Sequence, residues 1–428
     1  MTRAFGYAPL LADRQVRRLL IASMIARLPS AMLPLAVLLL VVESGGSIAA
    51  AGLCSGAYGI GRAALSPFVG ALVDRMGQAR VLIAGAVAQA AALVALIAVA
   101  NLHAPLPTVG AVAFIGGATS PPVQACLRAL WPLVADESER DTAYSFDATT
   151  QELIWIAGPL LVAAILGVGS AALAVAAAAA LACAGIGLFV TTPVSRQARG
   201  VQSGRWFTLR ALRAAPLRAL VGTNVLTGFA WGAMTFGLSA LAVLSGNPRS
   251  SGVLLAALSA GSIVGGLLFG ARRWSAGATS RFRVLLTANA VASAPLVLVR
   301  TVLAATPLAA IAGLTLAPIY ATSYVLTGRL APAGATTEAF TWTSSAFALG
   351  VALGTSAARI TTQSTAPWSA FALASAAPLA ASTLTFLLVA GPLTGNDGRG
   401  DATGLPRLRA SAPAAPAGIP PGSGGPDR

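Results

Sequence analysis

The stretch GALVDRMGQARVL, residues 70–82, places three charged residues and two glycines between two long apolar runs. The apolar run before it is rich in Gly and Ala, and another apolar run begins where the stretch ends. Gly70 and Gly77 allow a tight turn and close backbone approach, because glycine has no Cβ. The stretch is therefore a polar turn between apolar segments, and the rest of the sequence decides where that turn lies.

The composition is that of a membrane protein. The chain has 428 residues, of which 56% are hydrophobic and only 10% charged, and its mean hydropathy is +0.78. A soluble protein carries roughly 25% charged residues, so most of this surface must face lipid. The net charge of +15 would suggest nucleic acid in a soluble protein. Here every basic residue is Arg and the arginines avoid the apolar runs, so we expect no nucleic-acid partner.

The apolar runs predict an all-α polytopic membrane protein with about twelve spans, since each span needs about 20 residues. They lie near 19–42, 48–70, 80–100, 108–128, 143–166, 170–191, 217–243, 251–270, 283–299, 302–327, 339–357 and 368–391. The first run is too long for a cleavable signal peptide, and further spans follow it closely.

The arginines predict the orientation of these spans. With a cytoplasmic N-terminus, only Arg249, Arg300 and Arg359 fall outside the cell, while Arg27 and Arg62 fall inside helices. This asymmetry follows the positive-inside rule. We therefore expect a multi-pass protein of the plasma membrane with both termini in the cytoplasm.

The sequence divides into four parts. We expect an N-terminal six-helix bundle over 1–191, a basic cytoplasmic linker over 192–216, a C-terminal six-helix bundle over 217–392 and a disordered cytoplasmic tail over 393–428. The linker either connects the bundles and fixes topology, or forms an amphipathic helix on anionic lipid.

The two bundles show a weak internal repeat. A shift of 200 residues places the second apolar run on the eighth, as two repeated halves require. Gly70 and Gly77 then coincide with Gly270 and Gly277, whereas Asp74 coincides with Trp274. The glycines are repeated, and the acid is present in one half only.

The opening stretch resembles the loop signature of the major facilitator superfamily, G-x-x-x-D-R-x-G-x-x-R, between the second and third helices. Its residues here are Gly70, Asp74, Arg75, Gly77 and Arg80. The resemblance covers residues 15–391 and extends to unclassified actinobacterial members. It implies two pseudo-symmetric six-helix bundles, alternating access and a monomer whose partners are the bilayer and a small-molecule substrate.

A second resemblance lies in the fifth apolar run, ELIWIAGPLL. Gly158 and Pro159 resemble a Gly-Pro signature that many exporters of the superfamily carry in the fifth helix. The glycines that usually surround the pair are absent, and Leu160, Leu161 and Val162 follow it. The resemblance implies export, and the departure leaves that direction open.

The resemblance also implies a partner for Asp74, the start of the eleventh helix near Thr336 and Thr337. A carboxylate is stabilised at the positive N-terminal end of a helix, so this contact would hold the cytoplasmic side shut. Glu338 would compete for the same helix end. The alternative is that the turn only fixes topology.

Ionisable residues inside membrane spans are costly and usually functional. Arg27, Arg62, Asp147 and Glu152 are the candidates for proton coupling or substrate binding. Asp147 and Glu152 point about 140° apart around their helix, so they do not easily share a partner. The resemblance to the superfamily implies that the first and fifth helices lie close together, so we expect Arg27 to pair with Glu152, either as a static ion pair or as a proton site. Arg27 could equally bind a substrate carboxylate or phosphate.

The C-terminal half supplies the expected substrate cavity. By resemblance, its seventh and tenth helices line the cavity with Asn224, Thr227, Trp231, Tyr320 and Tyr324. Aromatic and hydroxyl groups together suit a small amphiphilic organic molecule.

Enzyme, metal and cofactor motifs are absent from the sequence. There is no phosphate-binding loop, no HExxH and no Cys/His cluster, and Cys54, Cys126 and Cys183 lie in separate spans. We therefore expect no catalytic residues, no metal and no cofactor. The sequence favours a secondary transporter that exports a small molecule with the proton gradient as its energy source. Uptake by proton symport or facilitated diffusion is the alternative, and a membrane sensor a remote one.

Overall fold

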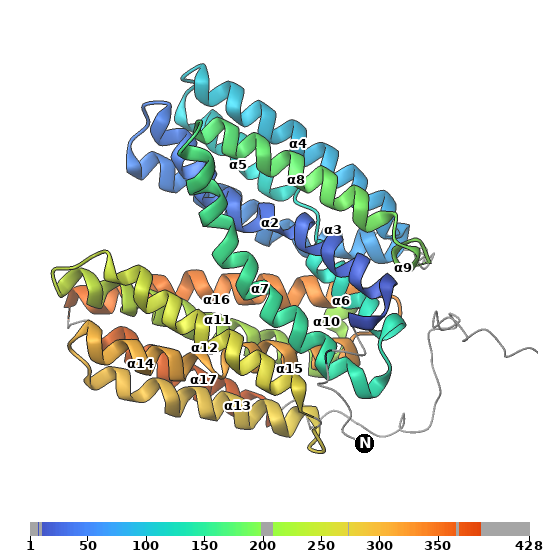
Figure 1. Ribbon diagram of the computed structural model, residues 1–428, viewed down its shortest axis with the longest axis vertical. Helices are drawn as coiled ribbons and strands as arrows, with labels where there is room; N and C mark the ends of the chain where they lie inside the picture. The colour runs from blue at the N-terminus through green and yellow to red at the C-terminus, as the bar shows by residue number, and fades with distance from the viewer. Residues whose placement is uncertain (1–6, 8–10, 198–208, 273, 365–367, 387–428) are drawn as a thin grey trace, which may run out of the picture.

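The computed structural model describes residue 7 and residues 11–197, 209–272, 274–364 and 368–386. In this part of the chain every regular element is a helix. The helices form two bundles, one drawn from blue to green and the other from yellow-green to red (Figure 1). The predicted tail over 393–428 and residues 198–208 of the predicted linker lie outside the described residues.

The first bundle contains the helices of the N-terminal half. They are α2 (Arg14–Glu43), α3 (Ile48–Met76), α4 (Gln78–Asn101), α5 (Leu106–Ala118), α6 (Val123–Val134), α7 (Glu137–Leu166), α8 (Ala171–Val190) and α9 (Pro193–Gln197). Within it α2 packs against α8, α7 and α3, and α3 packs against α5.

The second bundle contains the helices of the C-terminal half. They are α10 (Arg210–Arg213), α11 (Ala215–Leu244), α12 (Ser250–Ala271), α13 (Ala278–Ser293), η1 (Ala294–Leu298), α14 (Val302–Gly313), α15 (Leu316–Leu330), α16 (Thr336–Ser364) and α17 (Trp368–Leu384). Across the described part of both bundles, 9 helices are long and apolar enough to cross a membrane.

The fourth predicted span is broken into two helices. Pro121 and Pro122 stand between α5 and α6. They interrupt the helix because proline lacks the N–H that a continuing helix needs. After the break α6 runs on to Val134, beyond the predicted end of the span at residue 128. Arg128, which the arginine count placed on the cytoplasmic side, therefore lies in the middle of a helix and is 1% exposed.

The turn in residues 70–82 forms where the sequence predicts it. Helix α3 ends at Met76 and α4 begins at Gln78, with Gly77 between them at φ +90°. Residues with a side chain rarely adopt this backbone conformation, so glycine is required here. Gly70 lies against Thr341 of α16, and an added Cβ would collide with the threonine side chain.

The apolar core shows where the two halves meet. One cluster contains residues of both halves, among them Trp131 and Phe340. A second cluster, which contains Leu96, lies within the first half, and a third, which contains Phe371, lies within the second. Among the described residues the halves therefore share a core at one end only. We call this the joined end, where α3 and α12 finish and α7 and α16 begin, and the opposite end the far end.

The glycines of α3 and α12 also show that the halves are in contact at the joined end and apart toward the far end. At Gly266 and Gly270 of α12, an added Cβ would meet side chains of the first half, including Thr149. At Gly52 and Gly56, near the start of α3, an added Cβ would have no described atom within 4 Å. The halves are thus closely packed at the joined end and separate toward the far end.

Candidate functional site

Asp74 joins the two halves through the first turn of α16. Its Oδ1 accepts a hydrogen bond of 3.0 Å from the backbone N–H of Thr337, and its Oδ2 accepts one of 2.8 Å from the N–H of Glu338. N–H groups in the first turn of a helix have no partner within that helix, and the helix end is positive. The contact predicted for Asp74 is therefore present, and it lies at the joined end.

The other residues of the 70–82 turn surround this contact. Arg75 is half-buried and Arg80 is exposed. The Oε1 of Glu338 accepts a hydrogen bond of 3.4 Å from the N–H of Ala211 in the linker region. Glu338 stands in the first turn of α16, so its competition with Asp74 for this helix end stays a prediction.

A second contact joins the halves, and it was not predicted from the sequence. The Arg281 guanidinium of α13 binds Asp141 of α7 through two bonds, Nη1–Oδ2 at 2.8 Å and Nη2–Oδ1 at 2.9 Å. Such bidentate pairs are strong and directional. The indole of Trp274 lies 5.7 Å from the Arg281 guanidinium carbon and stacks near Phe269. The internal repeat matches Trp274 with Asp74. At this position the second half therefore has an aromatic residue, which lies beside the ion pair of Arg281 with Asp141.

Further hydrogen bonds link α7 to α12 beside that ion pair. Thr142 Oγ1 donates to the Gly270 carbonyl at 2.9 Å, and Ser145 Oγ donates to the Gly266 carbonyl at 2.7 Å. Tyr7, before α2, donates its hydroxyl to the same Gly266 carbonyl at 3.0 Å. The halves are therefore linked at the joined end by polar contacts as well as by the shared apolar core.

The buried charges of the first half form a cluster around Asp147. Arg27 Nη1 lies 2.6 Å from Asp147 Oδ1, and Arg128 Nε lies 2.8 Å from Asp147 Oδ2. Arg27 also donates to the Gln151 side chain, which accepts from Gln124 at 2.7 Å. We call Arg27, Arg128 and Asp147 the arginine cluster. Its two arginines are 3% and 1% exposed and its carboxylate 0%.

The expected pair of Arg27 with Glu152 is wrong. Because successive helical residues turn by about 100°, Asp147 and Glu152 occupy different faces of α7. Asp147 faces α2 and α6, while Glu152 faces α12 and accepts from Ser262 Oγ at 3.2 Å. Glu152 is 4% exposed, and none of the ion pairs found among the described residues includes it.

Arg128 is the principal residue of the site that was not predicted from the sequence. Its guanidinium carbon lies 3.4 Å from the ring centroid of Tyr324, which belongs to α15 of the second half. Two guanidinium nitrogens of the cluster, Arg27 Nε and Arg128 Nη2, are buried without a hydrogen-bond partner among the described residues. Two arginines share one carboxylate, so the cluster carries an excess positive charge that is costly to bury. The polar pair Gln124 and Arg128 within an apolar run was the signal that could have found it.

Arg62 and the Gly-Pro pair lie outside the cluster. Arg62 donates to the Ser30 carbonyl at 3.4 Å and thus joins α3 to α2. At Gly158, an added Cβ would lie 2.5 Å from the Cβ of Ala31. Gly158 and Pro159 therefore lie where α7 packs closely against α2, the helix that carries Arg27.

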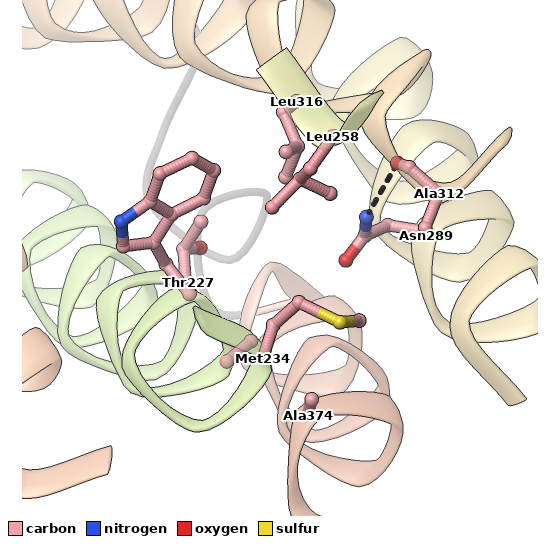
Figure 2. A pocket seen from close by; sticks show the side chains of 9 residues that line it. Thr227, Met234, Leu258, Asn289, Ala312, Leu316 and Ala374 are labelled. Carbon is pink, nitrogen blue, oxygen red and sulfur yellow. Dashed lines mark hydrogen bonds between the residues drawn. The ribbon is translucent and has the colours of Figure 1, made fainter. Parts of the chain in front are cut away.

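The residues predicted for the cavity lie on α11 and α15 of the second half and have different neighbours. Thr227 and Trp231 line a small pocket inside the second half, together with Met234 and Asn289 (Figure 2). Asn224 instead bonds Ser323 at 3.1 Å. Tyr320 packs edge-on against Phe347 and also against Trp231, with 6.5 Å between the ring centroids of Tyr320 and Trp231. Tyr324 covers Arg128. The set divides between a pocket, a helix contact and the arginine cluster.

Metal ligands do not gather in the described part of the chain, where no three His, Cys, Asp or Glu side chains lie together as a metal site requires. Cys54, Cys126 and Cys183 are free thiols. The chemistry of this site is therefore built from guanidinium, carboxylate and aromatic groups.

Comparison with known proteins identifies the family. Solved structures of transporters share the fold: a bacterial homologue of the iron transporter ferroportin in its outward-facing state has a TM-score of 0.74 at 15% identity, covering 88% of this chain and 100% of that one. The human organic anion transporter MFSD10 (TETRAN) has a TM-score of 0.65 at 18% identity, covering 88% and 100%. A variant of the E. coli fucose:proton symporter FucP has 0.67 at 13%, covering 88% and 99%. No curated protein matches the sequence significantly. The sequence profile of the Major Facilitator Superfamily matches residues 19–355, and this chain belongs to that superfamily of membrane transporters.

Proposed function

We propose that this transporter works by alternating access and exports a small amphiphilic organic molecule in exchange for protons. The joined end faces the cytoplasm in this proposal, because arginines concentrate there and cytoplasmic loops carry the excess of basic residues. The contacts of Asp74 and Arg281 then form a cytoplasmic gate, and the described conformation is outward-facing. Opening this gate would let substrate enter from the cytoplasm.

The proposed coupling to protons is supported by the position of Glu152. Its carboxyl group is buried between the halves, within hydrogen-bond distance of Ser262, and none of the ion pairs of the described residues gives it a cation. A carboxylate there is costly to bury, whereas a protonated carboxyl group is not. A proton taken up from outside would make this burial of Glu152 less costly, and its release to the cytoplasm after the joined end opens would complete the exchange.

Uptake by proton symport or by facilitated diffusion is the second candidate. It is favoured by the residues after the Gly-Pro pair, where Leu160, Leu161 and Val162 replace the glycines usual in exporters. The geometry around Glu152 serves either direction, because coupling depends on when the carboxyl group is protonated rather than on which way the substrate moves. The direction of substrate movement therefore distinguishes the two candidates.

The test uses everted membrane vesicles with an imposed pH gradient, acid inside, and three fluorescent amphiphiles: ethidium, N-phenylnaphthylamine and carboxyfluorescein. We expect one of these probes to accumulate, and its accumulation to lose its response to the gradient in Glu152→Gln. Glu43→Gln is the matched control, because Glu43 lies at the far end of α2 and accepts from Ala171 N–H at 2.8 Å, within the first half.

Two results would contradict the proposal. Retention of the pH response in Glu152→Gln would remove Glu152 as the coupling residue. Accumulation of the probe by intact cells, with none in everted vesicles, would favour the uptake candidate.

A further inference from the structure

The arginine cluster is built to hold more negative charge than it contains. Asp147 accepts from both Arg27 and Arg128, and one carboxylate cannot neutralise two guanidinium groups. Arg27 Nε and Arg128 Nη2 are buried donors with no hydrogen-bond partner in the described part of the chain. Buried donors without partners are destabilising, so an oxyanion that accepted from them would be bound favourably here.

The aromatic ring that covers the guanidinium of Arg128 belongs to the opposite half of the molecule. Arg27, Arg128 and Asp147 stand on α2, α6 and α7 of the first half, whereas the ring over Arg128 belongs to Tyr324 of α15. Tyr324 lies in the last two turns of α15, toward the joined end. When the halves separate at that end, α15 moves away from α6 and the cluster itself stays intact. The face of Arg128 would then be uncovered.

We infer that Arg128, supported by Arg27, binds the carboxylate, phosphate or sulfate group of an amphiphilic organic anion when the joined end is open. Guanidinium groups bind oxyanions through short charge-assisted hydrogen bonds. Asp147 holds Arg128 by Nε and thereby leaves Nη2 for the anion. The ring of Tyr324 takes the anion's place when the joined end closes. This inference rests on the proposed function, of which it names the substrate class.

The conformation in which the joined end is closed therefore binds the anion weakly. Tyr324 occupies the face of Arg128 at 3.4 Å, and the cation–π contact replaces the contact with substrate. An anion that binds at the open joined end would thus be expelled as that end closes. This order of events suits release at the far end.

The experiment measures anion binding to the purified full-length chain in detergent by titration calorimetry. The probes are 1-naphthoate, phenyl phosphate and octyl sulfate, with neutral 1-naphthamide as the uncharged control. Each is titrated into the parent and into the double variant Asp74→Asn/Arg281→Gln, which removes contacts that close the joined end. We expect one of the charged probes to bind the double variant at least tenfold more tightly than the parent, and naphthamide to show no difference.

Two further variants identify the residues. Adding Arg128→Gln to the double variant should weaken binding of the anion about tenfold or more, because a charge-assisted bond is lost. The Arg128→Gln substitution leaves Arg27 and Asp147 as a neutral ion pair, so we expect the fold to be retained. Tyr324→Leu in the otherwise unchanged chain should instead strengthen binding by uncovering Arg128. Arg300→Gln, a surface arginine that donates to the Val297 carbonyl at 2.7 Å, is the charge control.

The outcomes separate this inference from the proposed function. Absence of binding by all three anions to the double variant, or equal binding after Arg128→Gln, overturns the anion site. Equal binding of naphthamide and naphthoate also overturns it. Failure of proton-coupled export in vesicles, with anion binding intact, would overturn the transport direction and leave the site standing.

Discussion

Asp147 is the residue on which the arginine cluster depends, since its carboxylate is the shared partner of Arg27 and Arg128. Asp147→Asn would leave two buried guanidinium groups without a counter-charge. Removing one partner from a buried ion pair typically costs about 3–5 kcal/mol. We expect a clear fall in the thermal unfolding midpoint of Asp147→Asn in detergent, and a smaller fall in Arg128→Gln.

The double variant Asp147→Asn/Arg128→Gln tests whether charge is the cause. It restores the charge balance of the parent cluster, so its unfolding midpoint should lie above that of Asp147→Asn alone. Non-additivity of this kind is expected for residues in direct contact. Simple addition of the two single effects would mean that Asp147 acts through packing instead.

At the scale of the elements, the close packing of α7 on α2 depends on Gly158. An added Cβ would lie 2.5 Å from Ala31 Cβ and 2.7 Å from the Ala31 carbonyl carbon, so the helices would have to move apart. Such overpacking costs about 1–3 kcal/mol. We expect Gly158→Ala to lower the unfolding midpoint in detergent. Gly187→Ala in α8, where an added Cβ has no described atom within 4 Å, should leave it unchanged or raise it.

The elements themselves were largely predictable from the sequence, because apolar runs and turn residues are local signals. The turn at Gly77 and the helices on either side of it lie where the 70–82 stretch predicts. The contact of Asp74 with α16 was predicted only through the resemblance, since nothing local to Asp74 names a partner so distant in the chain.

The contacts between helices were less predictable, because they depend on how each helix is rotated. The spacing of Asp147 and Glu152 correctly predicted that they occupy different faces of α7, but it could not say which of them faces α2. Arg128 was missed because the fourth span was ended too early, at the first charge after the double proline. The pair of Arg281 with Asp141 joins two halves that no sequence motif connects.

At the scale of the whole molecule, the proposed gate predicts reciprocal movement of the two ends. The reporters are Ser145→Cys at the joined end and Gly52→Cys at the far end, each in a background without the native cysteines. Ser145 is 0% exposed and donates to α12, while an added Cβ at Gly52 has open space around it in the described part of the chain. Maleimide labelling of Ser145→Cys should therefore be slow and that of Gly52→Cys fast.

Weakening the joined end should reverse this order. Asp74→Asn reduces the attraction of its side chain for the α16 N–H groups, and Arg281→Gln breaks the ion pair with Asp141. Bonds to charged groups contribute roughly 1.5–3 kcal/mol each, which is enough to shift a two-state equilibrium about tenfold or more. We expect Ser145→Cys to label about tenfold faster in the double variant, and Gly52→Cys to label more slowly. Asp13→Asn, which changes an acid at the start of α2 that caps its own helix through Gln15 N–H, is the control. If both reporters label faster, the substitutions loosen the fold and the rigid-body gate is wrong, because two halves that rock about a central site cannot open at both ends together.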